Sequence, residues 1–333
     1  MYDHYIALDW AQSNMAIARL SKQAKKLSSV DQKSDILDLK AYLKSLAGKK
    51  ILTIEEGSTA QWLFVELHEC VDKILICDPR RNRLLSEGAK TDKVDAIKLV
   101  KLLKSGLLKE VYHTTDQFIY LRKIVSGYED LIKAGVRFKN QRSALYRCNG
   151  QNIGDTPSFN DAEKFVLRGL EKSVEMYEEE KKLYREEISK LCKQHKILKN
   201  LKSIPGIDDI GAIKIAARVV NPRRFPTKGK FLSFCGLVKH DKMSGGRSYG
   251  KRQSAYNREL KNVFDTAAIT CIVKNRKNFL KKRYDYLTIE KRFPDHQARR
   301  AISRYTAVLA LGVMKSGTPF KSRRLEEKDA LEK

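Results

Sequence analysis

The sequence predicts an α/β domain followed by a mainly helical remainder. Over the first 110 residues, short apolar runs alternate with amphipathic helical patterns, which is typical of an α/β sheet domain. From about residue 116 the apolar runs give way to long helical patterns rich in Glu, Lys and Leu. A chain of 333 residues is long enough for this organisation, because one domain typically takes about 100–200 residues.

The strands of the first part are expected where short apolar runs stop at a polar residue. Residues 5–8 and 15–20 are predicted to be strands that pair as a hairpin. Two further strands are predicted at 51–54 and 73–77. We place the sheet domain at residues 1–115.

The helices of this domain are expected to pack on the sheet. Residues 34–46 and 60–70 have apolar side chains at helical spacing. In the second of these helices, Trp62 and Leu63 are expected to face inward. Thr91 is predicted to cap a third helix that runs to residue 103.

The helical remainder is expected to contain an arm and a C-terminal domain. Helices near 118–148 and 161–200 mix charges with spaced apolar residues, which suits a helical hairpin or a coiled-coil arm over residues 116–200. A simple helical spacer and a dimerisation arm are both open interpretations of this pattern. Residues 201–320 form the predicted C-terminal domain, mainly helical, and the tail 321–333 is expected to be solvated.

The C-terminal domain carries two features typical of nucleic-acid binding. The run Ile204-Pro205-Gly206-Ile207 precedes a helix and resembles a helix-hairpin-helix element, in which backbone N–H groups, here around Gly206, contact a phosphate. A tight interhelical turn without a ligand is the alternative. Residues 221–261 carry 11 Lys and Arg against 2 Asp and Glu, with Tyr249 and Tyr256 among them.

The overall charge indicates a polyanionic partner. The formal net charge is +27 and the pI is about 9.8, so we favour nucleic acid over a merely well-solvated basic surface. No segment reaches the roughly 18 apolar residues that a membrane span needs. Six cysteines without a C-x-x-C spacing indicate free thiols in a reducing cytoplasm rather than a zinc site.

Four acidic residues are predicted to meet at one edge of the sheet. Asp9 and Glu55 each follow an apolar strand, so they project from the same edge if the two strands are neighbours. Asp92 and Asp95 are three residues apart on a helix and share a face. Carboxylates held together repel one another unless a cation neutralises them, and oxygen ligands suit Mg²⁺ or Mn²⁺. The sequence therefore predicts a divalent-metal site for phosphodiester chemistry, with Glu56 as the alternative to Glu55.

Several short motifs resemble those of the DEDD transposases of insertion-sequence family one-ten. The resemblance covers about residues 1–320. The motifs are the strand that ends at Asp9, the turn Glu55-Glu56-Gly57, the Asp78-Pro79 pair, the run Lys90-Thr91-Asp92-Lys93-Val94-Asp95-Ala96, and the later segments Ile204-Pro205-Gly206-Ile207, Phe234-Cys235-Gly236-Leu237 and Ser244-Gly245.

The resemblance implies an RNase H-like (RuvC-like) N-terminal domain, a coiled-coil arm and a C-terminal transposase domain with a catalytic serine. Asp9, Glu55, Asp92 and Asp95 match the metal-binding positions, and Ser244 matches the serine that attacks a DNA phosphate. A structured bridge RNA that pairs with donor and target DNA is implied as a further partner. Strand exchange needs at least two active sites, so a dimer or tetramer is expected. The function implied is transposition of an insertion sequence, in a prokaryotic cytoplasm and at the nucleoid.

The implied nucleophile, Ser244, lies between cations in the run Lys242-Met243-Ser244-Gly245-Gly246-Arg247. A serine hydroxyl attacks poorly until a base or a metal helps to remove its proton. Arg247, Lys251 and Arg252 are predicted to stabilise the charge on a transferring phosphate. A Ser-Gly-Gly loop selected for turn geometry is the alternative role of this segment, and Ser248 is the alternative nucleophile.

Two other functions fit the same residues. A metal-dependent RuvC-like nuclease or junction resolvase would use water as its nucleophile and leave Ser244 idle. A non-catalytic scaffold for nucleic acid would carry vestigial carboxylates. The chain has no G-x-x-x-x-G-K-[ST] loop for ATP, which agrees with a recombinase that conserves bond energy in a covalent intermediate.

Overall fold

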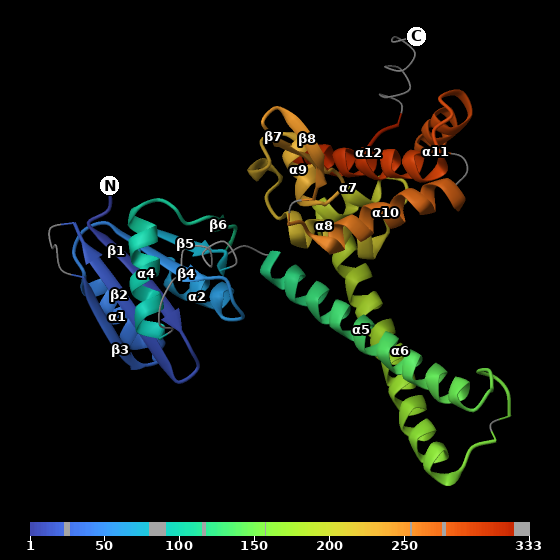
Figure 1. Ribbon diagram of the computed structural model, residues 1–333, viewed down its shortest axis with the longest axis horizontal. Coiled ribbons are helices and arrows are strands. Elements are labelled where there is room, and N and C mark those ends of the chain that lie inside the picture. The colour runs from blue at the N-terminus through green and yellow to red at the C-terminus, as the bar shows by residue number, and fades with distance from the viewer. Residues whose placement is uncertain are drawn as a thin grey trace. The chain divides into compact units, whose positions relative to one another are not determined.

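The chain folds as two units, residues 1–116 and 117–333, each described by itself (Figure 1). The first unit contains a sheet with helices on both faces, and the second is built mostly from helices. The coordinates are a computed structural model. They describe residues 1–22, 27–79, 91–114, 118–156, 158–253, 255–274 and 278–322.

A six-stranded mixed sheet organises the first unit, as the α/β prediction requires. Its parallel centre is formed by β1 (His4–Trp10), β4 (Lys50–Glu55) and β5 (Lys73–Cys77). Antiparallel strands complete the order β3-β2-β1-β4-β5-β6, namely β2 (Asn14–Ser21), β3 (Ser28–Lys33) and β6 (Glu110–Val111). The last two were not expected from the sequence, because β3 is a polar edge strand and β6 is two residues long.

The two faces of this sheet are covered differently. Helices α1 (Ile36–Ser45) and α2 (Ala60–Leu67) pack on one face, where β1 contributes Ile6 and Leu8. Helix α4 (Asp92–Lys104) packs on the other face. There the sheet presents small side chains, which allow α4 to lie close to β1 and β2: Ala7, Ala16 and Ala18. Alternate residues of β1 therefore point toward α4, and Asp9 belongs to that set.

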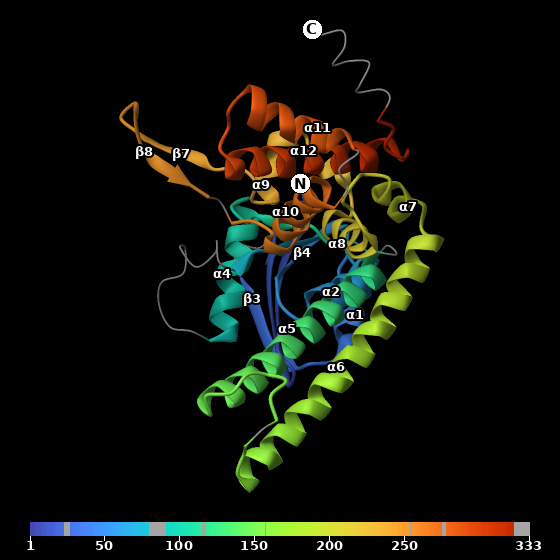
Figure 2. The same ribbon diagram turned by 90° about the vertical axis from the view of Figure 1, so that its right-hand side faces the viewer.

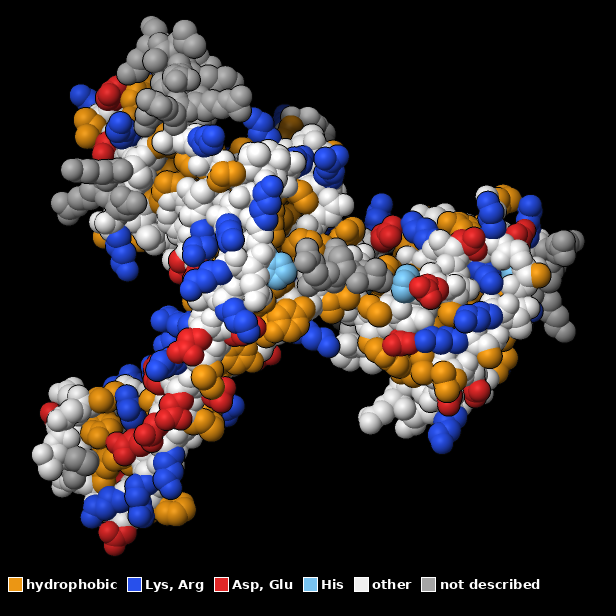
Figure 3. Space-filling view, turned by 180° about the vertical axis from the view of Figure 1, so that it is seen from behind, with side chains coloured by type: hydrophobic (Ala, Val, Ile, Leu, Met, Phe, Trp, Pro, Cys, Tyr) orange, Lys and Arg blue, Asp and Glu red, His pale blue; other side chains and the backbone are white. Residues whose placement is uncertain are grey.

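Two long antiparallel helices form an arm in the second unit (Figures 1 and 2). They are α5 (Phe118–Cys148) and α6 (Asp161–Gln194), and acidic, basic and apolar side chains lie side by side along them (Figure 3). The single helix expected over 161–200 is wrong in one respect. His195 adopts an extended conformation, so α6 ends before it and α7 (Lys196–Lys202) starts after it.

The base of the arm shares one hydrophobic core with the C-terminal helices. That core brings together α8 (Asp209–Val219), α9 (Lys228–Phe234), α10 (Arg258–Val273) and α12 (Asp295–Ser316). Helix α11 (Phe279–Asp285) packs beside this core. Two short helical turns complete the unit, η2 (Pro222–Arg224) and η3 (Tyr286–Glu290). Two ion pairs hold α8 in place, Lys214–Glu129 and Arg218–Glu259. The expected boundary near residue 200 therefore lies inside one unit. None of the helices in the described ranges is long and apolar enough to cross a membrane.

A β-hairpin that the sequence did not predict projects from this helical body and contains Ser244 (Figure 2). Its strands are β7 (His240–Ser244) and β8 (Arg247–Arg252), and every residue in them is exposed. The turn residues Gly245 and Gly246 have φ values of +54° and +75°. Two successive positive φ angles define the tight turn that best matches the twist of paired strands, and glycine adopts them at little cost.

Candidate active site

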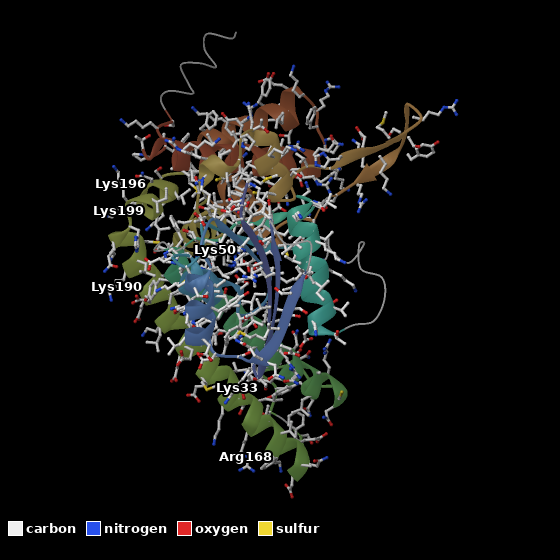
Figure 4. The ribbon with its side chains drawn as sticks, turned by 90° about the vertical axis from the view of Figure 1, so that its left-hand side faces the viewer. Lys33, Lys50, Arg168, Lys190, Lys196 and Lys199 are labelled. Atoms are coloured by element: carbon white, nitrogen blue, oxygen red, sulfur yellow. The ribbon has the colours of Figure 1, made fainter. Side chains whose placement is uncertain are left out.

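Asp9 and Glu55 lie next to each other at one edge of the sheet. The parallel register pairs Leu8 with Ile54, so the next residue of each strand is an acid. Residues in register on parallel neighbours point to the same face, and for this pair it is the face that α4 covers. The edge is the one where β3 ends at Lys33, whereas Lys50 marks the opposite edge (Figure 4).

Asp92 and Asp95 reach the same region from the first turn of α4. Thr91 caps the helix by accepting a hydrogen bond from the backbone N–H of Val94 at 3.3 Å. Acidic side chains in a first helical turn are stabilised by the positive end of the helix dipole, which explains locally why both are tolerated there. Lys98 lies 3.6 Å from the Asp95 carboxylate and offsets part of its charge.

The electrostatics of Asp9 show that the other three acids act on it. Partial burial, together with the negative charges of Asp92, Glu55 and Asp95, raises the pKa of Asp9 from 3.8 to about 6. A carboxyl group in such a field holds its proton more tightly than it does in water. The predicted set of four is therefore brought together by the fold at one sheet edge and on one face.

The neighbouring acid Glu56 points elsewhere. Its carboxylate lies 3.2 Å from Nε2 of His113, whose side chain is only 5% exposed. The His113 ring in turn packs against Phe64 of α2, with ring centroids 5.8 Å apart. Glu56 therefore faces the α2 side of the sheet, away from Asp9, and its charge is not among those that raise the pKa of Asp9.

The donor chemistry of the acidic edge suits a hard divalent cation. All four side chains offer carboxylate oxygens, the ligands that Mg²⁺ and Mn²⁺ prefer. Their mutual repulsion is the condition that a bound cation relieves. Across the described residues, no three acidic, His or Cys side chains are already close enough to enclose a metal ion. The residues thus fit a hard cation in the type of their ligand atoms, while their carboxylates are not gathered into a ligand cage.

Ser244 and its basic neighbours occupy the exposed hairpin of the second unit. Ser244 pairs with Arg247 across the turn, so these two side chains share a face of the hairpin. Further from the turn, Asp241 pairs with Lys251 and His240 with Arg252, beyond a register shift between Asp241 and Met243. The His240 ring is engaged with Ser233 Oγ at 3.0 Å, and along β7 it lies about 13 Å from Ser244.

Gly206 lies in the turn between α7 and α8, with a φ of +85°. A Cβ atom there would come within 2.3 Å of the carbonyl oxygen of Ala267 on α10, so packing alone requires glycine. Asp208 caps α8 by accepting from the backbone N–H of Gly211 at 2.8 Å, and Asp209 pairs with Lys202. Two acids at this helix end disfavour a bound phosphate.

Trp62 was expected to face inward, but its side chain is 41% exposed, because the first turn of α2 lies at the rim of the sheet. Two parts of the sequence motifs lie outside the described residues: Lys90, the first residue of the Lys90-Thr91-Asp92 run, and residues 323–333 of the tail. The exposed tryptophan was the residue that sequence reasoning assigned to the wrong environment.

Family models match both halves of the chain. A model of DEDD transposases of the IS110 type matches residues 6–147, which include all four acids. A second model, described as the transposase IS116/IS110/IS902 family, matches residues 198–285, which include Gly206 and Ser244. No curated protein matches the chain.

Replacing Asp9 by Asn is expected to stabilise the metal-free protein at neutral pH. The folded-state pKa of about 6 lies above the ordinary value of 3.8, so ionisation of Asp9 costs stability as the pH rises between these values. The full cost is present above about pH 6. At about pH 7.5 the variant should be more stable by about 1–2 kcal/mol after allowance for solvent screening, and below the lower value the difference should vanish.

Thermal or urea unfolding in the presence of a chelator measures this difference. Asp31→Asn, which changes an exposed acid on β3, is the matched control and should have little effect. Addition of Mg²⁺ should stabilise the wild type more than Asp9→Asn, because the cation relieves the same repulsion. Equal stability of wild type and Asp9→Asn at every pH would contradict the electrostatic coupling.

Proposed function

Because the chain belongs to the IS110 family of DEDD transposases, we propose that it cuts and rejoins DNA by attack of Ser244 on a phosphodiester, assisted by a divalent cation at the four carboxylates. The observation that carries the proposal is the position of Asp9 in the field of Glu55, Asp92 and Asp95 at one sheet edge. Structural ion pairs do not explain that arrangement, since three of its charges destabilise the fourth. The sheet order around β1 is consistent with an RNase H-like domain.

Asp9, Glu55, Asp92 and Asp95 would hold the cation. Glu55 is preferred over Glu56, since Glu56 faces the opposite side of the sheet and is paired with His113. When bound, Mg²⁺ or Mn²⁺ supplies Lewis acidity that polarises the scissile phosphate and neutralises charge in the transition state. The chain's own contribution is to fix the ligands from three rigid elements, β1, β4 and α4.

Ser244 is the proposed nucleophile. Its Oγ forms a bond to phosphorus while the bond from phosphorus to the 3′ oxygen breaks, which leaves a phosphoserine linkage and a 3′-hydroxyl. The serine proton passes to a base, and the departing 3′ oxygen takes up a proton. In the joining step a 3′-hydroxyl attacks the phosphoserine and releases the serine, so the number of phosphodiester bonds is conserved. The carboxylates and the serine belong to different units, so this chemistry requires that they meet on DNA.

The cations of the hairpin are proposed to hold the DNA. Arg247 shares a face with Ser244, which suits it to contact the phosphate under attack. Lys251 and Arg252, further along β8, suit neighbouring phosphates of the backbone. The turn at Gly206 is a weaker candidate for a phosphate contact, because Asp208 and Asp209 occupy the adjoining helix end.

Replacing Ser244 by Ala is expected to abolish the covalent protein–DNA adduct and to reduce strand exchange by about 10³-fold or more. The protein is incubated with Mg²⁺ and a DNA substrate that is nicked so that the cleaved strand cannot rejoin. Denaturing electrophoresis then measures the adduct. Ser248→Ala, which removes the hydroxyl at the alternative position on β8, is the matched control and should retain it.

Two results would separate the rival functions. Cleavage that persists in Ser244→Ala without an adduct would establish a water-dependent nuclease in place of the serine mechanism. Strand exchange that persists in Asp92→Asn would remove the role of the carboxylates and leave a nucleic-acid scaffold. The Ser244 mechanism with a metal-binding acidic edge requires that both substitutions stop strand exchange.

We further propose that the arm joins two copies of the chain. On α6 the exposed side chains Phe165, Met176 and Leu183 are 72%, 58% and 56% exposed. They are spaced at intervals of 11 and 7 residues, which places them within about 20° of one line along the helix. Buried residues of α6, for example Val174 and Ile188, lie on the opposite side of the helix. An apolar line that is exposed among the described residues suits a second helix from another copy.

Acidic substitutions on this apolar line of α6 should dissociate the proposed dimer. The double variant Met176→Glu with Leu183→Glu is expected to halve the molar mass of the protein in light scattering, because two carboxylates replace apolar contacts in the helix interface. Val166→Glu is the matched control, since Val166 is also exposed on α6 but lies about 100° from the line. An unchanged mass for the double variant would contradict a dimerisation arm and favour a helical spacer.

We propose a structured guide RNA as a partner on the strength of the family resemblance, and the net charge of +27 supports a polyanionic partner of some kind. Protein purified from cells that also carry the flanking DNA of its element should retain one discrete RNA species encoded by that DNA. Sequencing of the co-purified RNA measures this. Recovery of only a broad mixture of cellular RNA would contradict the guide, while leaving the carboxylate chemistry intact.

A further inference from the structure

Both tryptophans of the chain meet at the acidic edge of the sheet. The chain contains two tryptophans in 333 residues. Trp10 is the last residue of β1 and directly follows Asp9, and Trp62 lies in the first turn of α2. Their ring centroids are 5.5 Å apart and their planes are inclined at 70°, an edge-to-face contact.

This pair leaves aromatic surface open to solvent. Trp10 packs partly against the core beneath α1 and α2, whereas the side chain of Trp62 is 41% exposed. Among the described residues of the first unit, Trp62 is the one large aromatic side chain that is exposed. An edge-to-face contact occupies at most one face of each ring, so a planar group can still stack on the other.

Contacts of neighbouring residues anchor the helix that carries Trp62. The neighbouring side chain, Gln61, donates a hydrogen bond from Nε2 to the carbonyl oxygen of Thr114 at 3.0 Å, which ties the first turn of α2 to the segment after β6. On the same helix, Phe64 packs against His113. A rigid aromatic surface binds a flat ligand with little loss of side-chain freedom, because its orientation is already fixed.

The negative charge of this edge disfavours nucleic acid, so binding there needs an interaction that does not depend on charge. Asp9, Glu55 and the acids of α4 repel the phosphates of a nucleic-acid strand, and a bound cation offsets only part of that repulsion. Lys33, exposed at the end of β3, is a cation at the same edge (Figure 4). Stacking of a base on an aromatic ring does not depend on charge and accepts any base.

We propose that Trp62, supported by Trp10, is a stacking platform for an unpaired base of the strand whose phosphate lies at the carboxylates. The proposal rests on the proposed function, because it needs a nucleic acid at this edge. Consecutive residues of β1 point to opposite faces, so Asp9 and Trp10 flank the rim of the sheet from its two sides. The phosphate and the adjoining base of one nucleotide would then be held by neighbouring residues of one strand.

Tryptophan fluorescence tests the platform directly, since both fluorophores belong to it. Titration of the full chain with a single-stranded oligonucleotide should quench the emission. Affinity is measured in parallel as the anisotropy of a labelled oligonucleotide. Trp62→Leu should lose most of the quenching and weaken binding roughly tenfold, the scale of one lost stacked base. Trp62→Phe, which keeps an aromatic ring, should retain most of the affinity.

Further measurements keep the test decisive. Leu107→Ala alters another exposed apolar residue of the same unit and should bind like the wild type. With the wild-type protein, an abasic position moved along the oligonucleotide should reduce the quenching at one position only, a readout that no variant's folding can affect. Quenching that no abasic position reduces, or wild-type affinity in Trp62→Leu, would overturn the platform alone. A wild-type protein that binds no oligonucleotide would overturn both the platform and the proposed function.

Discussion

Repulsion among the carboxylates at one sheet edge is the constraint on which the N-terminal unit depends. The register of β1 and β4 puts Asp9 beside Glu55, and the alanines beneath α4 let that helix bring Asp92 and Asp95 close to them. Larger side chains at Ala7 or Ala16 would push the helix outward and weaken the coupling. The fold therefore accepts an electrostatic cost at the place where a cation is proposed to bind, and the helix dipole and Lys98 offset part of it.

Sequence reasoning succeeded for the strands that are buried and failed for those that are exposed. Strands β1, β2, β4 and β5 were predicted because their apolar runs fill a core, and β3 was missed because it is a polar edge strand. The hairpin around Ser244 was missed for the same reason, since all of its residues are exposed and no apolar alternation marks it. Its signal was the Gly245-Gly246 pair, which was considered as a loop with turn geometry but not as the turn that joins two strands.

The acidic edge was within reach of the sequence because strand ends and helical spacing are local properties. Other features depend on partners distant in sequence. The direction of Glu56 is determined by His113, which lies beyond the whole of β5 and α4. The glycine at 206 is required by the backbone of α10, so a pattern typical of phosphate binding has a packing explanation as well. The exposure of Trp62 depends on where α2 meets the rim, which helical periodicity alone does not reveal.

The carboxylates and Ser244 belong to different units, and this bears on how DNA cleavage is controlled. Ser244 lies on an exposed hairpin, where the described residues give its hydroxyl no hydrogen-bond partner and His240, on the same strand, is held by Ser233. A serine hydroxyl in that setting is a poor nucleophile, so its activation has to come from groups outside the hairpin. On the proposed mechanism those groups arrive only when DNA brings the acidic edge to the serine. Cleavage would then be tied to assembly, which keeps an exposed nucleophile from cutting DNA that is not ready to be rejoined.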